Sequence, residues 1–126
     1  MPYICKEPDK SLEGTFVDDG YGGYKGECVS LVKKMCPGMP ATRDWKRGKL
    51  VKGDMGVAKG TAIATFKADG KYKSGDGHAA IYISQDATGL LVWDQYNHPK
   101  KGVGQRQLKF GGKGDSNDGD KFYVIE

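Results

Sequence analysis

Residues 27–36 carry the clearest helical pattern in the chain. Four apolar side chains recur there at intervals of three and four residues, on one face of an α-helix: Cys28, Leu31, Val32 and Met35. Gly26 stands directly before this segment, and Pro37 and Gly38 directly after it are residues that end helices. The pattern therefore predicts a short helix over 27–36 with one apolar face.

Beyond residue 57 the pattern changes to runs of β-branched and aromatic residues that glycine-bearing turns separate. Such runs predict strands. The five runs are 60–66, 78–84, 90–96, 105–110 and 121–126. Gly89, in the turn between the second and third runs, suits a hairpin with a bulge. One helix followed by successive strands predicts an α+β fold, in which an N-terminal helix that carries a cysteine packs on an antiparallel β-sheet of about five strands.

The chain of 126 residues shows no repeat, no linker and no change of composition, so we expect a single domain over 1–126. A second helical turn is expected at Thr42. Hydrophobic residues make up 37% and charged residues 29%, as in soluble globular proteins. No run approaches the ~18 apolar residues that a membrane helix needs. The first residues lack the basic and apolar regions of a secretory signal peptide, so we expect synthesis in the cytoplasm.

The charge balance is mildly basic, with 20 Lys and Arg against 16 Asp and Glu, a formal net charge of +4. This excess suits an anionic partner such as nucleic acid or a cell-wall polymer, but a solvated surface explains it equally well. Because net charge acts mainly on solubility and on steering, it does not by itself predict a nucleic-acid binder.

Three cysteines are present, Cys5, Cys28 and Cys36, and they form neither a CxxC pair nor a metal-ligand spacing. Because three is an odd number, at least one thiol stays free in a monomer. In an oxidising compartment Cys5 and Cys36 can pair and leave Cys28 alone, whereas all three stay reduced in the cytoplasm. The sequence leaves both states open.

Cys28 lies in the first turn of the predicted helix, where unpaired N–H groups and the helix dipole favour negative charge. This position lowers the pKa of a thiol and favours the reactive thiolate. A lone cysteine on an apolar helix face is more often a core residue, so the nucleophile needs a partner. His78, which follows "SGDG" at the start of a predicted strand, is the candidate base. An imidazole there can take the thiol proton and pass it to a leaving amine.

A third polar group should orient the imidazole of His78, and three candidates stand in "VWDQYN". A hairpin centred on 87–88 places residue 97 or 98 opposite His78, so Asp94 lies too far along the strand unless a bulge bends the chain back. A carboxylate is nevertheless the best partner for an imidazolium. We therefore favour Asp94, with Gln95 and Asn97 as alternatives.

Three parts of the chain together resemble a known family. They are "YKGECVSLVKK", the pair "GTAIATF" and "GHAAIYIS", and "VWDQYN", in this order. They resemble the NlpC/P60 and CHAP branch of papain-like cysteine amidases and, more narrowly, the small bacterial amidases related to type VI secretion effectors. The resemblance runs from about residue 12 to the C-terminus.

The resemblance implies a cysteine hydrolase that cleaves an amide bond in peptidoglycan stem peptides, with Cys28 as nucleophile and His78 as base. The oxyanion donors would be the backbone N–H of Cys28 and one other group, and Tyr21 or Tyr24 is the candidate for that role or for lining the cleft. Delivery by a secretion machine into the periplasm of a target bacterium would follow, and a cognate immunity protein would then be a partner.

Other functions remain as alternatives to this interpretation. The same core would serve a catalytically inactive binding module with a papain-like fold, or a housekeeping cell-wall hydrolase. The acidic segment "DSNDGD" at 115–120 has its glycine at the wrong position for a calcium loop, and His78 and His98 lack the spacing of zinc ligands. We therefore predict neither a metal nor a cofactor.

Overall fold

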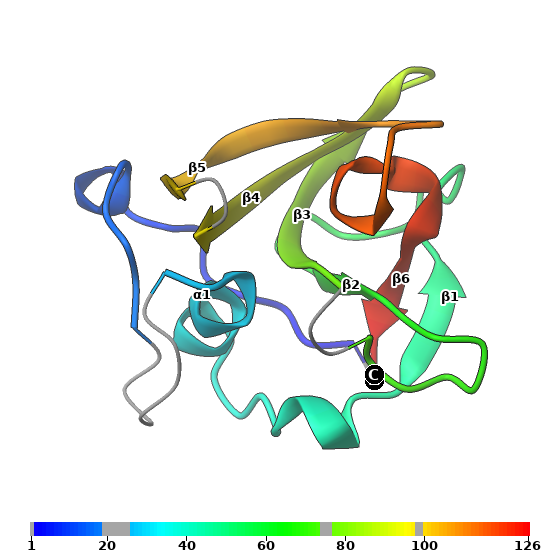
Figure 1. Ribbon diagram of the computed structural model, residues 1–126, viewed down its shortest axis with the longest axis horizontal. Coiled ribbons are helices and arrows are strands. Elements are labelled where there is room, and N and C mark those ends of the chain that lie inside the picture. Colours follow the sequence, from blue (N-terminus) through cyan, green and yellow to red (C-terminus); the bar gives the residue numbers. More distant parts are fainter. Residues whose placement is uncertain (1, 19–25, 74–76, 98–99) are drawn as a thin grey trace.

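The computed structural model describes residues 2–18, 26–73, 77–97 and 100–126, and within these ranges it has one α-helix beside a single sheet (Figure 1). Helix α1 spans Cys28–Met35. The strands are β1 (Arg47–Leu50), β2 (Ala62–Thr65), β3 (Ala79–Gln85), β4 (Gly89–Asn97), β5 (Lys100–Lys109) and β6 (Phe122–Ile125). Short 3-10 turns are η1 (Lys10–Leu12), η2 (Thr42–Asp44), η3 (Asp115–Asn117) and η4 (Gly119–Lys121). None of the helices in these ranges is long and apolar enough to cross a membrane.

The strands form one six-stranded antiparallel sheet in the order β1-β6-β2-β3-β4-β5. The predicted α+β class is confirmed, and so are the helix and the turn at Thr42. The predicted number of about five strands is one too low, because β1 was missed. Its sequence "RGKL" is mostly exposed at the edge of the sheet, so it carries no apolar alternation that would reveal a strand.

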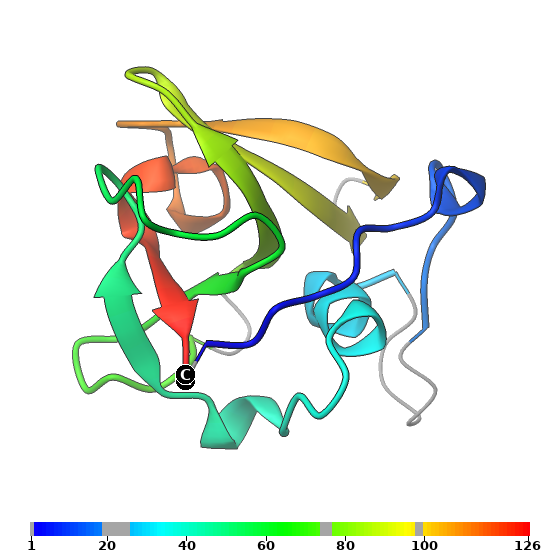
Figure 2. The same cartoon turned by 180° about the vertical axis from the view of Figure 1, so that it is seen from behind.

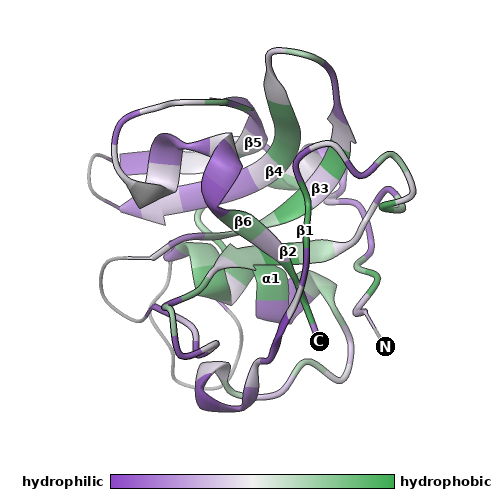
Figure 3. Cartoon of the chain, turned by 90° about the vertical axis from the view of Figure 1, so that its right-hand side faces the viewer, coloured by the Kyte–Doolittle hydropathy of each residue, from purple (hydrophilic) through white to green (hydrophobic). Residues whose placement is uncertain are grey.

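The sheet is buried on both faces, and β3 shows how. Side chains alternate along a strand, so Ala79 and Ile81 join the cluster that contains α1, while Ala80 and Tyr82 join a second cluster on the opposite face. The second cluster includes Phe122 of β6. Figure 3 shows the hydrophobic positions of α1, β2 and β3 gathered in the centre of the molecule, with β5 largely hydrophilic.

Helix α1 packs against β3 and β4. It lies at the end of this hairpin opposite its turn, where β3 begins and β4 ends (Figure 1). Leu31 and Val32 are fully buried in this contact, and Cys28 and Ser30 are buried as well. Because β3 begins at Ala79, the first turn of the helix comes close to the residue that precedes the strand. This packing places the predicted nucleophile near the predicted base.

The N-terminal segment, dark blue in Figure 2, runs past α1 on the side that faces the viewer there, and it is covalently joined to the end of the helix. The structure pairs Cys5 with Cys36 in a disulfide and leaves Cys28 as a free thiol. Backbone hydrogen bonds support the same arrangement, because the N–H of Lys6 donates to the carbonyl of Met35 over 2.8 Å. The disulfide therefore joins the start of the chain to the end of the helix that carries Cys28.

We expect the Cys5–Cys36 bond to contribute substantially to stability. It closes a loop across a sequence separation of 31 residues, and the loss of chain entropy in the unfolded state corresponds to about 3–4 kcal/mol for a loop of this length. The double variant Cys5→Ser, Cys36→Ser should therefore unfold at a lower urea concentration than the wild type.

Reductant supplies the control for this prediction. Dithiothreitol should shift the urea midpoint of the wild type to that of the double variant and leave the variant itself unchanged. Equal midpoints for wild type and variant without reductant would show that the disulfide adds nothing to the free energy of unfolding.

Candidate active site

Cys28 is the first residue of α1 and is buried, with 7% of the residue exposed. Glu27 precedes it as the N-cap and makes no side-chain capping bond. In this first turn the N–H of Ser30 donates to the carbonyl of Glu27 over 3.1 Å. The position at the start of a helix is the one that the sequence predicted for a reactive thiol.

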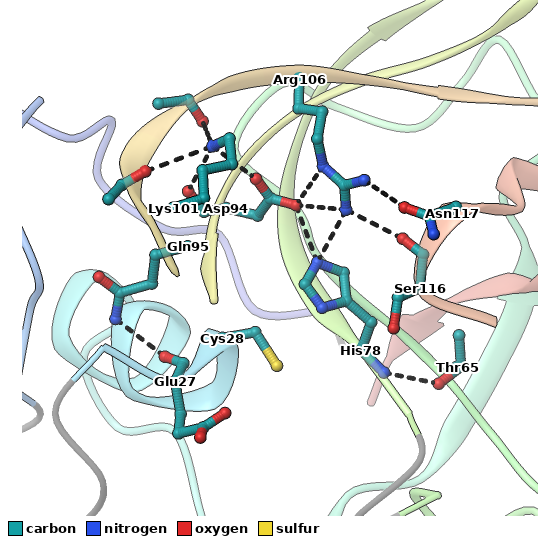
Figure 4. A network of polar contacts seen from close by, with 12 residues as sticks. Glu27, Cys28, Thr65, His78, Asp94, Gln95, Lys101, Arg106, Ser116 and Asn117 are labelled. Carbon is teal, nitrogen blue, oxygen red and sulfur yellow. Dashed lines mark hydrogen bonds and ion pairs between the residues drawn. The ribbon is translucent and has the colours of Figure 1, made fainter. Parts of the chain in front are cut away.

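His78 precedes β3 and is held there by its backbone. Its N–H donates to Oγ1 of Thr65 over 3.0 Å, and the N–H of Thr65 donates to the carbonyl of His78 over 3.0 Å. A side chain at Gly77 would collide with the carbonyl of Lys73 and with the Thr65 hydroxyl, so only glycine fits there. The ring of His78 is thereby directed toward the space that the sulfur of Cys28 faces (Figure 4).

The imidazole of His78 binds the carboxylate of Asp94, with 2.8 Å between Nε2 and Oδ2. Both residues are buried, and Asp94 has no exposed surface. The register count had placed Asp94 too far along β4. A bulge between Tyr82 and Ser84 shifts the pairing by one residue, so that Ile81 pairs with Trp93, and the same register continued to His78 would bring it opposite residue 96. Asp94 lies two residues before it on the same face of the sheet, within reach of a diagonal contact.

Two further cations surround Asp94, and sequence reasoning missed both. Lys101 donates from Nζ to Oδ1 over 3.0 Å. Arg106 donates to Oδ2 from Nε over 2.9 Å and from Nη2 over 2.8 Å (Figure 4). Gly104 pairs with Asp94 across β4 and β5, so Arg106 is its diagonal neighbour. The alternation along β5 would have indicated this contact had the register of the two strands been known.

The carboxylate of Asp94 is ionised in this setting. Burial opposes the charge, but the hydrogen bond and charge of His78, followed by those of Arg106, outweigh burial and hold the pKa of Asp94 below its usual range. An ionised carboxylate only accepts hydrogen bonds, so Nε2 of His78 carries the hydrogen. The other ring nitrogen, Nδ1, is then the one available to Cys28.

The thiol and the imidazole shift each other's titration. Burial opposes the charge on His78, but its hydrogen bond to Asp94 and its interaction with Cys28 raise its pKa from 6.5 to about 9. Burial also raises the pKa of Cys28, but the hydrogen bond and charge of His78 outweigh it and bring the net pKa below the ordinary value of 9.0. Each group therefore favours the charged form of the other, and the thiolate–imidazolium pair forms more readily than it would from isolated groups.

Gln95 and Asn97, the alternative partners of His78, contact the segment before α1 instead. The side-chain amide of Gln95 is fully buried, accepts from the N–H of Val17 over 2.8 Å and donates to the carbonyl of Glu27 over 2.8 Å. Nδ2 of Asn97 donates to the carboxylate of Glu27 over 3.3 Å. Among the three candidates, Asp94 is the one that the structure places on His78.

A tyrosine that the sequence did not single out lies beside the thiol. The hydroxyl oxygen of Tyr72 is 3.9 Å from Sγ of Cys28. Burial and the charge of Cys28 raise the pKa of Tyr72 well above its usual range, so the phenol keeps its proton. Tyr21 and Tyr24, the tyrosines considered from the sequence, lie outside the described residues.

The fold and the site together define a class: an α+β protein whose thiol, at the start of a helix, faces an imidazole bound to a buried carboxylate. This is the arrangement that nucleophilic cysteine catalysis requires. A family model described as "Domesticated amidase effector 2" matches residues 2–125. The chain therefore belongs to this family.

Individual relatives agree with this assignment. A "Domesticated amidase effector 2" of Ixodes scapularis is 42% identical over 127 residues, which cover 97% of this chain and 83% of that protein. A "Type VI secretion amidase effector 2 protein" of Salmonella typhi is 30% identical over 142 residues and the whole of both chains. The solved structure of "Type 6 secretion amidase effector 2 (Tae2)" has a TM-score of 0.75 and 26% identity, over 97% of this chain and 93% of that chain. The predicted amidase class and the likeness to type VI effectors are confirmed.

We expect Cys28 to form its thiolate at a lower pH than an ordinary cysteine does. Because the imidazolium of His78 lowers the thiol's pKa, the pH profile of Cys28 alkylation by iodoacetamide should have its midpoint below pH 9. The raised pKa of His78 means that the imidazolium is present at neutral pH and is lost as pH rises through about 9. The variant His78→Gln should slow alkylation at pH 7 by about tenfold.

Mass spectrometry of the single free cysteine measures these rates. The variant Lys34→Gln removes an exposed cation from the same helix and should leave the alkylation profile unchanged. A wild-type profile with its midpoint at or above pH 9, or one that His78→Gln does not move, would show that the imidazole does not activate the thiol.

Proposed function

We propose that the protein is a cysteine amidase of the papain-like NlpC/P60 kind that hydrolyses an amide bond in peptidoglycan stem peptides. The observation that carries this proposal is the cluster of Cys28, His78 and Asp94 in a chain of an amidase effector family. The family supports the reaction, and the cluster supports the residues that perform it.

In this mechanism the thiolate of Cys28 attacks the carbonyl carbon of the scissile amide and forms a tetrahedral oxyanion. The imidazolium of His78 gives a proton to the leaving nitrogen as the C–N bond breaks, which releases an amine and leaves a thioester on Sγ. The neutral imidazole then takes a proton from water, whose oxygen attacks the thioester. Release of the acid restores the thiolate and the imidazolium.

Asp94 maintains the tautomer and the charge of the imidazole that these steps require. Its bond to Nε2 fixes the tautomer, so that Nδ1 is the nitrogen that exchanges protons with Cys28 and with the leaving group. Its negative charge stabilises the imidazolium that precedes proton donation. A carboxylate that is buried and ionised serves this purpose better than an amide.

Two groups beside Sγ are our candidates for donating hydrogen bonds to the oxyanion. The backbone N–H of Cys28 belongs to the first turn of α1 and is directed away from the helix. The hydroxyl of Tyr72, next to Sγ, stays protonated and can donate to the developing charge. We therefore assign to Tyr72 the role that the sequence had suggested for Tyr21 or Tyr24.

The substrate and the setting follow from the relatives' names and from charge. One relative is named as a type VI secretion effector, which supports delivery out of a producing cell and action in the periplasm of a target bacterium. The carboxylates of stem peptides complement the net charge of +4. A toxin of this kind requires a cognate immunity protein in the producer. A housekeeping role in cell-wall turnover would use the same chemistry without that partner.

Digestion of purified peptidoglycan tests the proposal. The wild type should release new fragments, which liquid chromatography and mass spectrometry resolve, and their masses identify the bond that is cleaved. Cys28→Ala should release none, because it lacks the nucleophile. Folded wild type that leaves peptidoglycan of several bacterial types intact would favour the catalytically inactive binding module.

Tyr72→Phe should lower turnover by about 10²-fold, because the variant lacks one donor to the oxyanion. Tyr123→Phe is a matched control, since both tyrosines pack edge-on against Phe66 while Tyr72 is the one beside Sγ. Initial rates of fragment release measure the effect. Equal rates for the two variants would remove Tyr72 from the mechanism.

A further inference from the structure

We propose that Arg106 is a positioning residue that shares the Oδ2 atom of Asp94 with His78 and thereby limits how tightly the imidazole holds its proton. This inference rests on the proposed function, in which His78 must donate that proton to the leaving nitrogen. The residue lies on β5, opposite Val92 in the register, and no local feature of the sequence marks it.

Arg106 is fixed at both ends of its guanidinium group. Nε and Nη2 both donate to Oδ2 of Asp94. On the far side Nη1 donates to Oδ1 of Asn117 over 2.6 Å, and Nη2 donates to the carbonyl of Ser116 over 2.9 Å. The plane of the group lies over the ring of Tyr96, with Cζ 5.0 Å from the ring centre. A group held in this way keeps its charge at one place beside the carboxylate.

Lys101 holds the other carboxylate oxygen. Its Nζ donates to Oδ1 of Asp94 and lies within 3.5 Å of the carbonyls of Gly102 and Gly104. Each oxygen of Asp94 therefore has its own cation, and the carboxylate stays in place even when one of these contacts is lost. If Arg106 were removed, Lys101 would still hold the carboxylate in place, and His78 would be the remaining donor to Oδ2.

The position of Arg106 relative to His78 gives it an electrostatic role. Nη2 lies 3.4 Å from Nε2 of His78, and both nitrogens carry hydrogens that are directed at the same oxygen. They compete for Oδ2, and the positive charge of the guanidinium opposes a positive imidazole. Arg106 thus preserves the ionised carboxylate while it weakens the attraction between that carboxylate and the imidazolium.

The other groups around His78 either favour its protonated form or carry no charge. Asp94 on β4 and the thiolate of Cys28 on α1 favour the imidazolium. Tyr72 contacts the thiol and stays neutral. The rings of Tyr96 and Phe122 lie edge-on to the imidazole and carry no charge. With two anions beside it, His78 would hold its proton tightly, and Arg106 is the cation that directly faces it among the described residues.

Titration of the imidazole by NMR tests the inference without any substrate. The chain has two histidines, so the spectrum of His78→Gln assigns the signals. In a Cys28→Ala background, which removes the thiolate, Arg106→Met should raise the pKa of His78 by about one unit, because the opposing charge is lost. Arg106→Lys keeps the charge and should stay near the parent value.

Activity supplies the second measurement, with Cys28 intact. Arg106→Met should lower kcat at neutral pH roughly tenfold, with little change in KM, because a more basic imidazole gives up its proton more slowly. The alkaline limb of its pH profile should move upward together with the pKa of His78. Lys109→Met removes an exposed cation from the same strand and should change neither measurement.

The outcomes separate this inference from the proposed function. A pKa of His78 that falls or stays constant in folded Arg106→Met would overturn the inference, because a purely structural arginine would let Asp94 drift away from the ring. Should Arg106→Met fail to fold, Arg106→Gln provides the same loss of charge with donors retained for Asn117. If Arg106→Met raises the pKa of His78 but the wild type digests no peptidoglycan, the proposed function is refuted and the effect of Arg106 on the imidazole still stands.

Discussion

The complete burial of the Asp94 carboxylate is the constraint on which the rest of the site depends. A buried charge is unfavourable unless it is paired and fully hydrogen-bonded. Its partners are three residues, His78 before β3 and Lys101 and Arg106 on β5. Strands β3, β4 and β5 must therefore pair in one register. The bulges in β3 and between Asp94 and Tyr96 set that register. The geometry of the imidazole is thus a consequence of how the sheet satisfies one anion.

Gln95, the residue after Asp94, positions the part of the site that carries Cys28. Because side chains alternate on a strand, Asp94 and Gln95 point to opposite faces of β4. Asp94 reaches the imidazole, and Gln95 binds Val17 and Glu27, which lead into the helix of Cys28. One short piece of β4 therefore locates both the base and the nucleophile, and the disulfide secures the far end of that helix.

Much of this site could be predicted from the sequence because its signals are local. The helix of Cys28 has an apolar face and clear end residues, and His78 directly precedes a strand with a clear sequence pattern. Arg106, Lys101 and Tyr72 were missed for a physical reason: each reaches the site through strand pairing or a loop path that no nearby residue specifies. Even the acidic turn at 115–120, set aside as a false calcium loop, supplies the acceptors at Ser116 and Asn117 that complete Arg106.

The alternation of Asp94 and Gln95 on β4 also governs how this family can diverge. A change in the length of that strand by a single residue would exchange the two faces. The carboxylate would then meet the entry to the helix, and the amide would meet the histidine. Relatives that are 26–42% identical show that many side chains can be replaced. A one-residue insertion or deletion in the middle of β4 would therefore disrupt the site, whereas a change of length in a turn outside the sheet would leave these two faces as they are.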